Sequence, residues 1–187
     1  PYFSEYVKAE LLTWCKNNTK PDGSSYNLYT DGLKIFTTID SKLQEFAENA
    51  VTQQMTQVQN QFFEHWGKEK PWKGKESLVE EAIHRSNRYR NLKQKGLSED
   101  EIMEVLNKPI PMRLFTWQGE EESKISPIDS IKHHLQYLNA GFLAMSPLTG
   151  EVKAWVGGIE HDFFQYDHVK ASTKRQVGST FKPIVYA

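Results

Sequence analysis

The sequence predicts an α+β fold, in which helices dominate residues 2–138 and an antiparallel hairpin occupies residues 141–157. Through the first part, apolar residues recur every three or four positions, as they do on one face of a helix. From Gly141 the apolar residues alternate instead, on either side of the turn Pro147-Leu148-Thr149-Gly150, as in a β-hairpin. This change of period divides the chain into residues 1–138 and residues 139–187.

The composition limits the classes of function that the chain can serve. Its 187 residues carry 23 basic and 24 acidic side chains, so the net charge is −1 and gives no electrostatic reason to expect nucleic acid. An aromatic content of 12% argues against disorder. No apolar segment has the length of a membrane span. The single cysteine, Cys15, lies in an apolar stripe and is expected to be a buried thiol.

The first third of the chain predicts a helix, a strand and a second helix. Residues 2–16 are amphipathic with helical spacing, residues 33–38 alternate as a strand, and Asp40 caps a helix whose apolar stripe runs from Leu43 to Val58. Residues 61–76 hold four aromatic side chains among lysines and glycines. We expect an irregular loop that these rings pin to the core, with a surface for a partner or glycan as the alternative.

The middle of the chain predicts two capped helices. The pairs Ser77 and Glu80, and Ser98 and Glu101, have the spacing of capping boxes. The basic run at residues 85–95 between them is expected to be a solvated helix end and loop, with contact to phosphate or lipid head groups as the alternative.

Residues 112–117 alternate as a strand, and an acidic loop at residues 120–122 follows them. Ser126 and Pro127 then predict the start of a helix that runs to Leu138. His133 and His134 are adjacent, so they point in different directions and are expected on the surface. The pairs His161-Asp162 and Asp167-His168 could bind metal, but with no thiolate or H-E-x-x-H pattern they are read as loop residues.

The most informative pattern is Ser179-x-x-Lys182. Residues three apart lie on one face of a helix, so the lysine amine can reach the serine hydroxyl. Serine becomes a nucleophile when a base takes its proton, and a helix N-terminus favours the neutral lysine that could serve as this base. Gly178 permits a tight turn and Pro183 is tolerated only in a first turn, so we expect Ser179 at a helix N-terminus. A capping serine beside a solvated lysine is the alternative.

The run Arg175–Pro183 resembles the nucleophile motif of class A, bifunctional, penicillin-binding proteins. The start of the chain, with Pro-Tyr-Phe, a helix and then residues 32–44, resembles the segment that follows the glycosyltransferase domain in that family. The hairpin ending at Gly157-Gly158 resembles the opening transpeptidase strands of the family. Residues 61–107 resemble the family only weakly. Tyr166-Asp167-His168, where an Asn-Arg pair is frequent, and Val177, where proline is common, suggest a divergent branch.

The resemblance implies that residues 1–138 are an interdomain linker or the N-terminal part of the transpeptidase region. It also implies that residues 139–187 begin a transpeptidase domain of the penicillin-binding-protein and β-lactamase type. It implies a D,D-transpeptidase in which Ser179 is the nucleophile and an oxyanion donor and Lys182 is the general base. Peptidoglycan stem peptides, β-lactam antibiotics and cell-wall synthesis proteins are the implied partners. No metal or organic cofactor is implied. The implied parent also carries a glycosyltransferase domain and an upstream anchor that holds it on the extracytoplasmic face of the bacterial membrane.

The sequence is also compatible with two other functions. A serine β-lactamase shares the nucleophile, and a non-catalytic interaction module would use residues 61–125. The S-D-N and K-T-G motifs that accompany S-x-x-K are not among these 187 residues. We therefore expect the isolated chain to be inactive. We also expect residues from about 160 onward to be loosely held, or ordered only by contact with another chain, because an isolated hairpin and a short helix are marginal in water.

Overall fold

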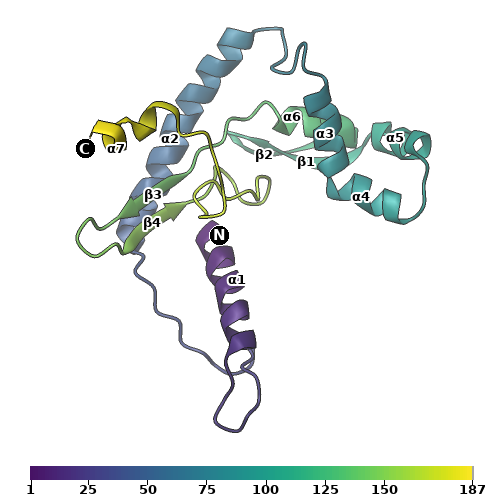
Figure 1. Cartoon of the computed structure of the whole chain (residues 1–187). Coiled ribbons are helices and arrows are strands. Elements are labelled where there is room, and N and C mark those ends of the chain that lie inside the picture. The colour runs from purple at the N-terminus through teal and green to yellow at the C-terminus, as the bar shows by residue number, and fades with distance from the viewer. Residues whose placement is uncertain (187) are drawn as a thin grey trace. The chain divides into compact units, whose positions relative to one another are not determined.

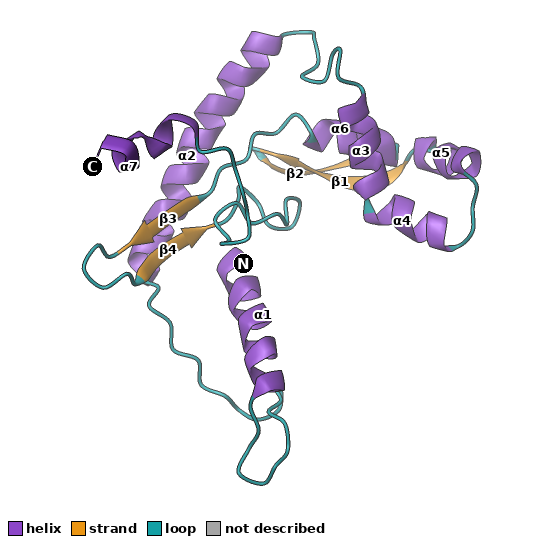
Figure 2. Ribbon diagram, in the orientation of Figure 1, coloured by secondary structure: helices purple, strands orange, loops and turns teal. Residues whose placement is uncertain are grey.

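The computed structural model describes residues 1–186 and confirms the α+β class (Figures 1 and 2). The helices are α1 (Tyr2–Asn17), α2 (Ser41–Trp66), α3 (Ser77–Arg85), α4 (Asn87–Gln94), α5 (Glu99–Asn107), α6 (Pro127–His134) and α7 (Lys182–Tyr186), with a 3₁₀ turn η1 (Gly178–Phe181). The strands are β1 (Ile110–Thr116), β2 (Gly119–Ile125), β3 (Phe142–Met145) and β4 (Val152–Val156).

The described chain forms two compact units. Unit 1 combines residues Pro1–Val51 with the segment from Ala140 onward, and unit 2 is Thr52–Asn139. The sequence boundary near residue 139 thus coincides with a unit boundary, but the first 51 residues group with the C-terminal segment. The assignment of residues 1–138 and 139–187 to domains of a longer protein stays a prediction.

Unit 1 is built around the predicted hairpin, which is confirmed. β3 and β4 are antiparallel, with Phe142 opposite Val156 and Met145 opposite Val152. Ala154 and Val156 of β4 are buried against Ala47 of α2. The Gln44 side chain on α2 also bonds the β4 backbone, accepting from the Trp155 N–H at 2.7 Å and donating to its carbonyl at 2.9 Å. An amide side chain thus takes the place of a neighbouring strand.

The predicted strand at residues 33–38 is wrong. These residues are extended but pair with no strand in the described chain. Only the end of the segment contacts β4, through the Thr38 hydroxyl bonded to the Val152 carbonyl at 2.8 Å and the Asp40 N–H bonded to the Lys153 carbonyl at 3.0 Å. Phe36 is 90% exposed, so the alternating pattern lacks a buried face.

The first two helices follow the sequence closely at their starts. α1 is confirmed with Cys15 buried, and the Asp40 carboxylate caps α2 by accepting from the backbone N–H groups of Lys42 and Leu43. However, α2 continues to Trp66, so Phe62, Phe63 and Trp66 are helical and not part of a loop. Gly67 ends the helix with a φ of 52°, a conformation that glycine adopts without steric cost.

Unit 2 has a helical core and a second hairpin. Its hydrophobic core cluster joins three helices through Val79 and Ile83 of α3, Ile102 and Leu106 of α5, and Ile128 of α6. β1 confirms the predicted strand. β2 corrects the prediction of an acidic loop, because Glu120–Glu122 pair in register with Phe115–Arg113 and keep their carboxylates in solvent.

The helix caps of unit 2 were predicted in part. The Ser98 and Glu101 capping box is confirmed, and Ser126 caps α6 with Pro127 at its first position. The box at Ser77 is wrong, since that residue already lies in α3 and makes no cap bond. The basic run is a separate helix, α4, because the Ser86 side chain accepts from the Tyr89 N–H at 3.2 Å.

α6 ends at His134 and not at Leu138. The backbone beyond it bonds instead to Gln59 of α2, which is fully buried. The Gln59 amide donates to the Gln136 carbonyl at 2.9 Å and accepts from the Leu138 N–H at 2.8 Å. These two bonds satisfy the Leu138 N–H, which a longer helix would have paired internally, and the Gln136 carbonyl, which a helix ending at Leu138 would have left without an intrahelical partner.

The two adjacent histidines are not the surface residues that were predicted. His133 Nε2 lies 2.8 Å from the Phe115 carbonyl of β1, and His134 Nε2 accepts from the Phe115 N–H at 3.4 Å. His134 Nδ1 lies 2.8 Å from the Ser130 carbonyl. Burial is the main cause that lowers the pKa of His134, so the neutral ring is favoured in this position.

Candidate active site

The predicted nucleophile and base lie on one continuous helical segment. Gly178 opens it with a φ of 51°, which supports the tight turn expected there. Ser179 follows in η1, and the N–H of Lys182 donates to the Ser179 carbonyl where the 3₁₀ turn passes into α7. Side chains at i and i+3 eclipse one another in a 3₁₀ turn, so this backbone brings the Ser179 hydroxyl and the Lys182 amine to the same side.

The surroundings of this pair are open in the described chain. Ser179 and Lys182 are both exposed, and no hydrogen bond joins their side chains within residues 1–186. The apolar side chains Phe181, Ile184 and Val185 on the same segment are 46%, 69% and 64% exposed. The segment therefore presents Ser179 and Lys182 to solvent on one helical turn.

The segment that precedes this pair is held in place by hydrogen bonds as far as Thr173. Asp167 is its centre: one carboxylate oxygen accepts from Trp155 Nε1 and the other from the Val169 N–H, each at 3.0 Å. The Asp167 carbonyl accepts from the Thr173 hydroxyl at 2.6 Å. The expectation that the chain is loosely held from residue 160 is thus wrong as far as Thr173, because Asp167 has a structural role that a metal-binding or loop reading did not foresee.

Tyr2 fixes the other side of the same segment. Its hydroxyl donates to the Phe164 carbonyl at 2.5 Å, and its ring lies against Gly157 and Gly158. Burial, and then the carboxylates of Glu160 and Asp167, raise the pKa of this phenol, so it remains a donor. This role of Tyr2 was not predicted from the sequence, although a Gly-Gly pair is a pattern typical of close backbone approach.

A cleft of about 370 Å³ opens between α1 and the loop at residues 161–173. Ser179 and Lys182 do not line it, so it is separate from the nucleophile segment. Within residues 1–186, no cluster of three or more His, Cys, Asp or Glu side chains is arranged to hold a metal ion. The same residues include no helix that is long and apolar enough to cross a membrane.

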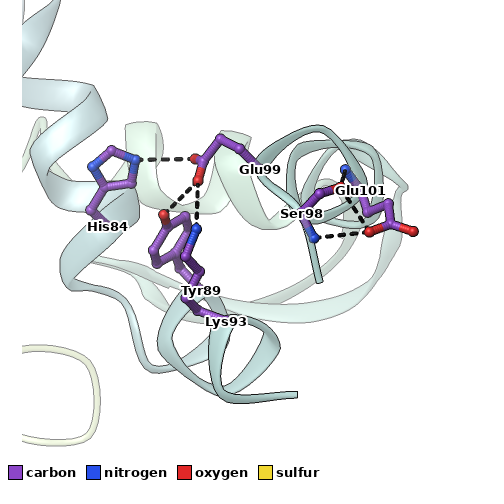
Figure 3. Close-up of polar contacts among 6 residues, drawn as sticks. All are labelled: His84, Tyr89, Lys93, Ser98, Glu99 and Glu101. Atoms are coloured by element: carbon purple, nitrogen blue, oxygen red, sulfur yellow. Dashed lines mark hydrogen bonds and ion pairs between the residues drawn. The ribbon is translucent and has the colours of Figure 1, made fainter. Parts of the chain in front are cut away.

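A cluster of polar contacts joins three helices of unit 2 (Figure 3). The Glu99 carboxylate of α5 accepts from the Tyr89 hydroxyl of α4 at 2.7 Å and lies 3.3 Å from His84 Nε2 of α3 and 3.5 Å from Lys93 Nζ. The Tyr89 bond is the main cause that lowers the pKa of Glu99. Because these groups are about half exposed, the cluster contributes only modestly to the packing of the three helices.

The comparisons with known proteins agree on one family. Residues 67–138 match the model of the penicillin-binding protein middle domain, and this match lies inside unit 2. It covers much of the region where the resemblance read from the sequence was weak. No solved structure matches the chain.

Two curated relatives align with nearly the whole chain, and each is named penicillin-binding protein 1A. The protein of Rickettsia bellii (strain RML369-C) is 25% identical over 212 residues, and that of Rickettsia prowazekii (strain Madrid E) is 23% identical over 214. Each alignment covers 99% of this chain and 25% of the relative, so the chain spans about a quarter of their length. The middle-domain match and these alignments show that the chain is similar to penicillin-binding proteins over nearly its whole length, as its resemblance to the class A members implied.

Proposed function

We propose that these residues form part of a penicillin-sensitive peptidoglycan D,D-transpeptidase, with Ser179 as its nucleophile and Lys182 as its general base. The observation that carries the proposal is the shared helical turn of Ser179 and Lys182, entered through the positive φ of Gly178, in a chain that is similar to penicillin-binding proteins. That turn supplies the two groups that acyl transfer by an activated serine requires.

The proposed reaction proceeds in two steps. Ser179 Oγ attacks the carbonyl carbon between the two terminal D-alanines of a stem peptide, and its proton passes to Lys182 Nζ. The backbone N–H of Ser179 donates to the oxyanion that forms. Collapse of this intermediate breaks the amide bond, and the departing D-alanine amine takes the proton from Lys182. General base assistance of this kind is worth roughly 10²–10⁴-fold, and one oxyanion donor about 10²–10³-fold.

An amine from a neighbouring stem peptide then attacks the serine ester. It passes a proton through Lys182 to Ser179 Oγ, and a new amide cross-link replaces the ester. A β-lactam would acylate the same serine, because its strained amide presents a similar carbonyl. No metal or organic cofactor takes part in this scheme.

The proposed setting is a longer protein on the extracytoplasmic face of the bacterial membrane, anchored upstream and carrying a glycosyltransferase domain. The fourfold greater length of the curated relatives supports the presence of further domains. Stem peptides, β-lactams and other cell-wall synthesis proteins are its proposed partners.

Labelling with fluorescent penicillin tests this function in the full-length gene product. We expect covalent labelling that Ser179→Ala abolishes and that a Lys182→Ala substitution slows by roughly 10²–10⁴-fold. Ser172→Ala, which removes a hydroxyl from the preceding loop, is the matched control and should label normally. Full labelling of the Ser179→Ala variant contradicts the assignment.

The same assay separates the two alternatives. A β-lactamase would release hydrolysed penicillin with multiple turnovers, whereas a transpeptidase retains the acyl group. A non-catalytic module would show no labelling and would bind its partner equally well after Ser179→Ala.

A further inference from the structure

Unit 2 contains a small apolar pocket that the proposed catalysis does not use. Its volume is about 220 Å³, and helices α4 and α5, strand β1 and the start of α6 form its walls. The lining residues are Leu92, Val105, Leu106, Ile110 and Pro127, with Arg88 and Asn91 at the α4 side. All of them belong to the unit that carries the middle-domain match.

The size of the pocket restricts what can enter it. Pockets for drug-sized ligands and cofactors measure about 300–1,000 Å³, whereas an apolar cavity of about 150 Å³ holds a single benzene ring. A pocket of about 220 Å³ therefore has room for one large apolar side chain. Its mouth is open, because Val105 in its wall is 41% exposed although the neighbouring Leu106 is fully buried at 1%.

The charge at the mouth indicates what accompanies that side chain. Arg88 is the charged residue among those that line the pocket, and its guanidinium has no hydrogen bond or ion pair within residues 1–186. The other basic side chains of α4 have contacts of their own, since Arg90 donates to Asn87 and Lys93 pairs with Glu99. Asn91 lies one turn after Arg88 and adds an amide on the same helix face.

An unpaired guanidinium beside an apolar pocket complements a carboxylate beside an apolar side chain. Arginine binds carboxylates through two parallel hydrogen bonds, and residues three or four apart on a helix project together. We propose that this pocket, bounded by α4 and α5, docks an acidic amphipathic helix of a partner protein. One apolar side chain of the partner enters the pocket, and a carboxylate one turn away pairs with Arg88. This is the helix-in-groove mode of recognition with a single anchoring residue.

Synthetic peptides test the proposal with the full chain. The probe is an alanine-rich helical peptide of about 16 residues with a central phenylalanine and glutamates three and four positions away on either side. Matched peptides replace the phenylalanine by alanine or the glutamates by glutamine. Titration into the ¹⁵N-labelled chain, followed by NMR, measures affinity and location together.

We expect saturable binding of the probe, with shifts centred on Val105, Ile110 and the Arg88 side chain. Arg88→Glu should weaken binding by about tenfold to hundredfold, which is the range for a charge-assisted hydrogen bond. Val105→Trp should weaken it comparably by filling the pocket. Arg90→Glu makes the same charge change on the same helix outside the lining, and at an ionic strength of about 0.15 M it should cost less than about threefold. An unchanged backbone spectrum of each variant verifies its fold.

Several results would overturn the proposal. They are no saturable binding up to ~1 mM peptide, equal losses for Arg88→Glu and Arg90→Glu, or equal affinity for the peptide that lacks glutamate. Binding to phosphatidylglycerol vesicles that exceeds peptide binding, with equal dependence on both arginines, would assign the basic surface to lipid head groups instead.

Discussion

Replacing Gln59 by leucine should destabilise unit 2, although leucine is the more hydrophobic residue. The side chain is fully buried and pairs with both the Gln136 carbonyl and the Leu138 N–H. Leucine leaves both backbone groups without this partner, and each unpaired buried group costs about 1–3 kcal/mol. Burial of the leucine side chain returns about 1.5–3 kcal/mol. With the middle of each range, about 4 kcal/mol lost and about 2 kcal/mol returned, the net loss in the free energy of unfolding is about 2 kcal/mol, and we expect about 1–3 kcal/mol.

Thermal and urea unfolding of the full chain measure this loss. For a chain of this size, the loss corresponds to a fall in Tm of about 2–12 °C. Gln57→Leu is the matched control, because Gln57 lies on the same helix and is exposed, so its effect should stay within about 0.5 kcal/mol. Hydrogen exchange of the Leu138 amide reports the lost bond directly and should accelerate in Gln59→Leu alone. Wild-type stability of that variant, or a Leu138 amide that stays protected, would show that the two hydrogen bonds of Gln59 do not stabilise unit 2.

Three further predictions concern other parts of the chain. In Gly157→Ala, the new Cβ would lie 2.6 Å from Tyr2 Cγ and 2.6 Å from Asp167 Oδ1, so urea unfolding should show a loss of about 1–3 kcal/mol. The loss should shrink in a Tyr2→Ala background, and equal losses in both backgrounds would contradict the contact. Because the folded-state pKa of His134 lies below its usual value near 6.5, this residue should leave stability unchanged above about pH 6.5 and reduce it as the pH falls through the folded pKa. A His134→Gln variant should show a flatter pH profile, and an unchanged profile would argue against this residue. The isolated 187-residue chain should not acylate with penicillin, because its Ser179 and Lys182 are exposed and lie outside the cleft of unit 1; Ser179-dependent labelling within minutes would contradict this.

Local patterns predicted the elements that local physics controls. The capping carboxylate of Asp40, the Ser98 box and the Ser126-Pro127 start each depend on residues within one turn, and all three are present. The change of period at Gly141 located the hairpin for the same reason. Ser179, Lys182 and the turn at Gly178 could likewise be placed on one helical segment from spacing alone.

Elements that depend on distant partners could not be predicted in this way. β2 contains mostly glutamates and other polar residues, and it is a strand because β1 pairs with it and Arg113 contacts Glu120 at 2.8 Å. Residues 33–38 show the reverse, since their β-type pattern finds no partner strand in the described chain. Tyr2 supports the segment before the nucleophile from 162 positions away, a separation that no local spacing rule reaches.

Mass spectrometry of the penicillin-labelled full-length protein tests directly whether Ser179 is the nucleophile. Tryptic cleavage after Arg175 gives a peptide that begins at Gln176 and contains two adjacent hydroxyls, Ser179 and Thr180. Fragmentation of this peptide assigns the added mass to one of them. We expect a single penicilloyl group on Ser179, since this hydroxyl shares a helical turn with Lys182. An adduct on Thr180, or on a peptide outside residues 176–186, would contradict it.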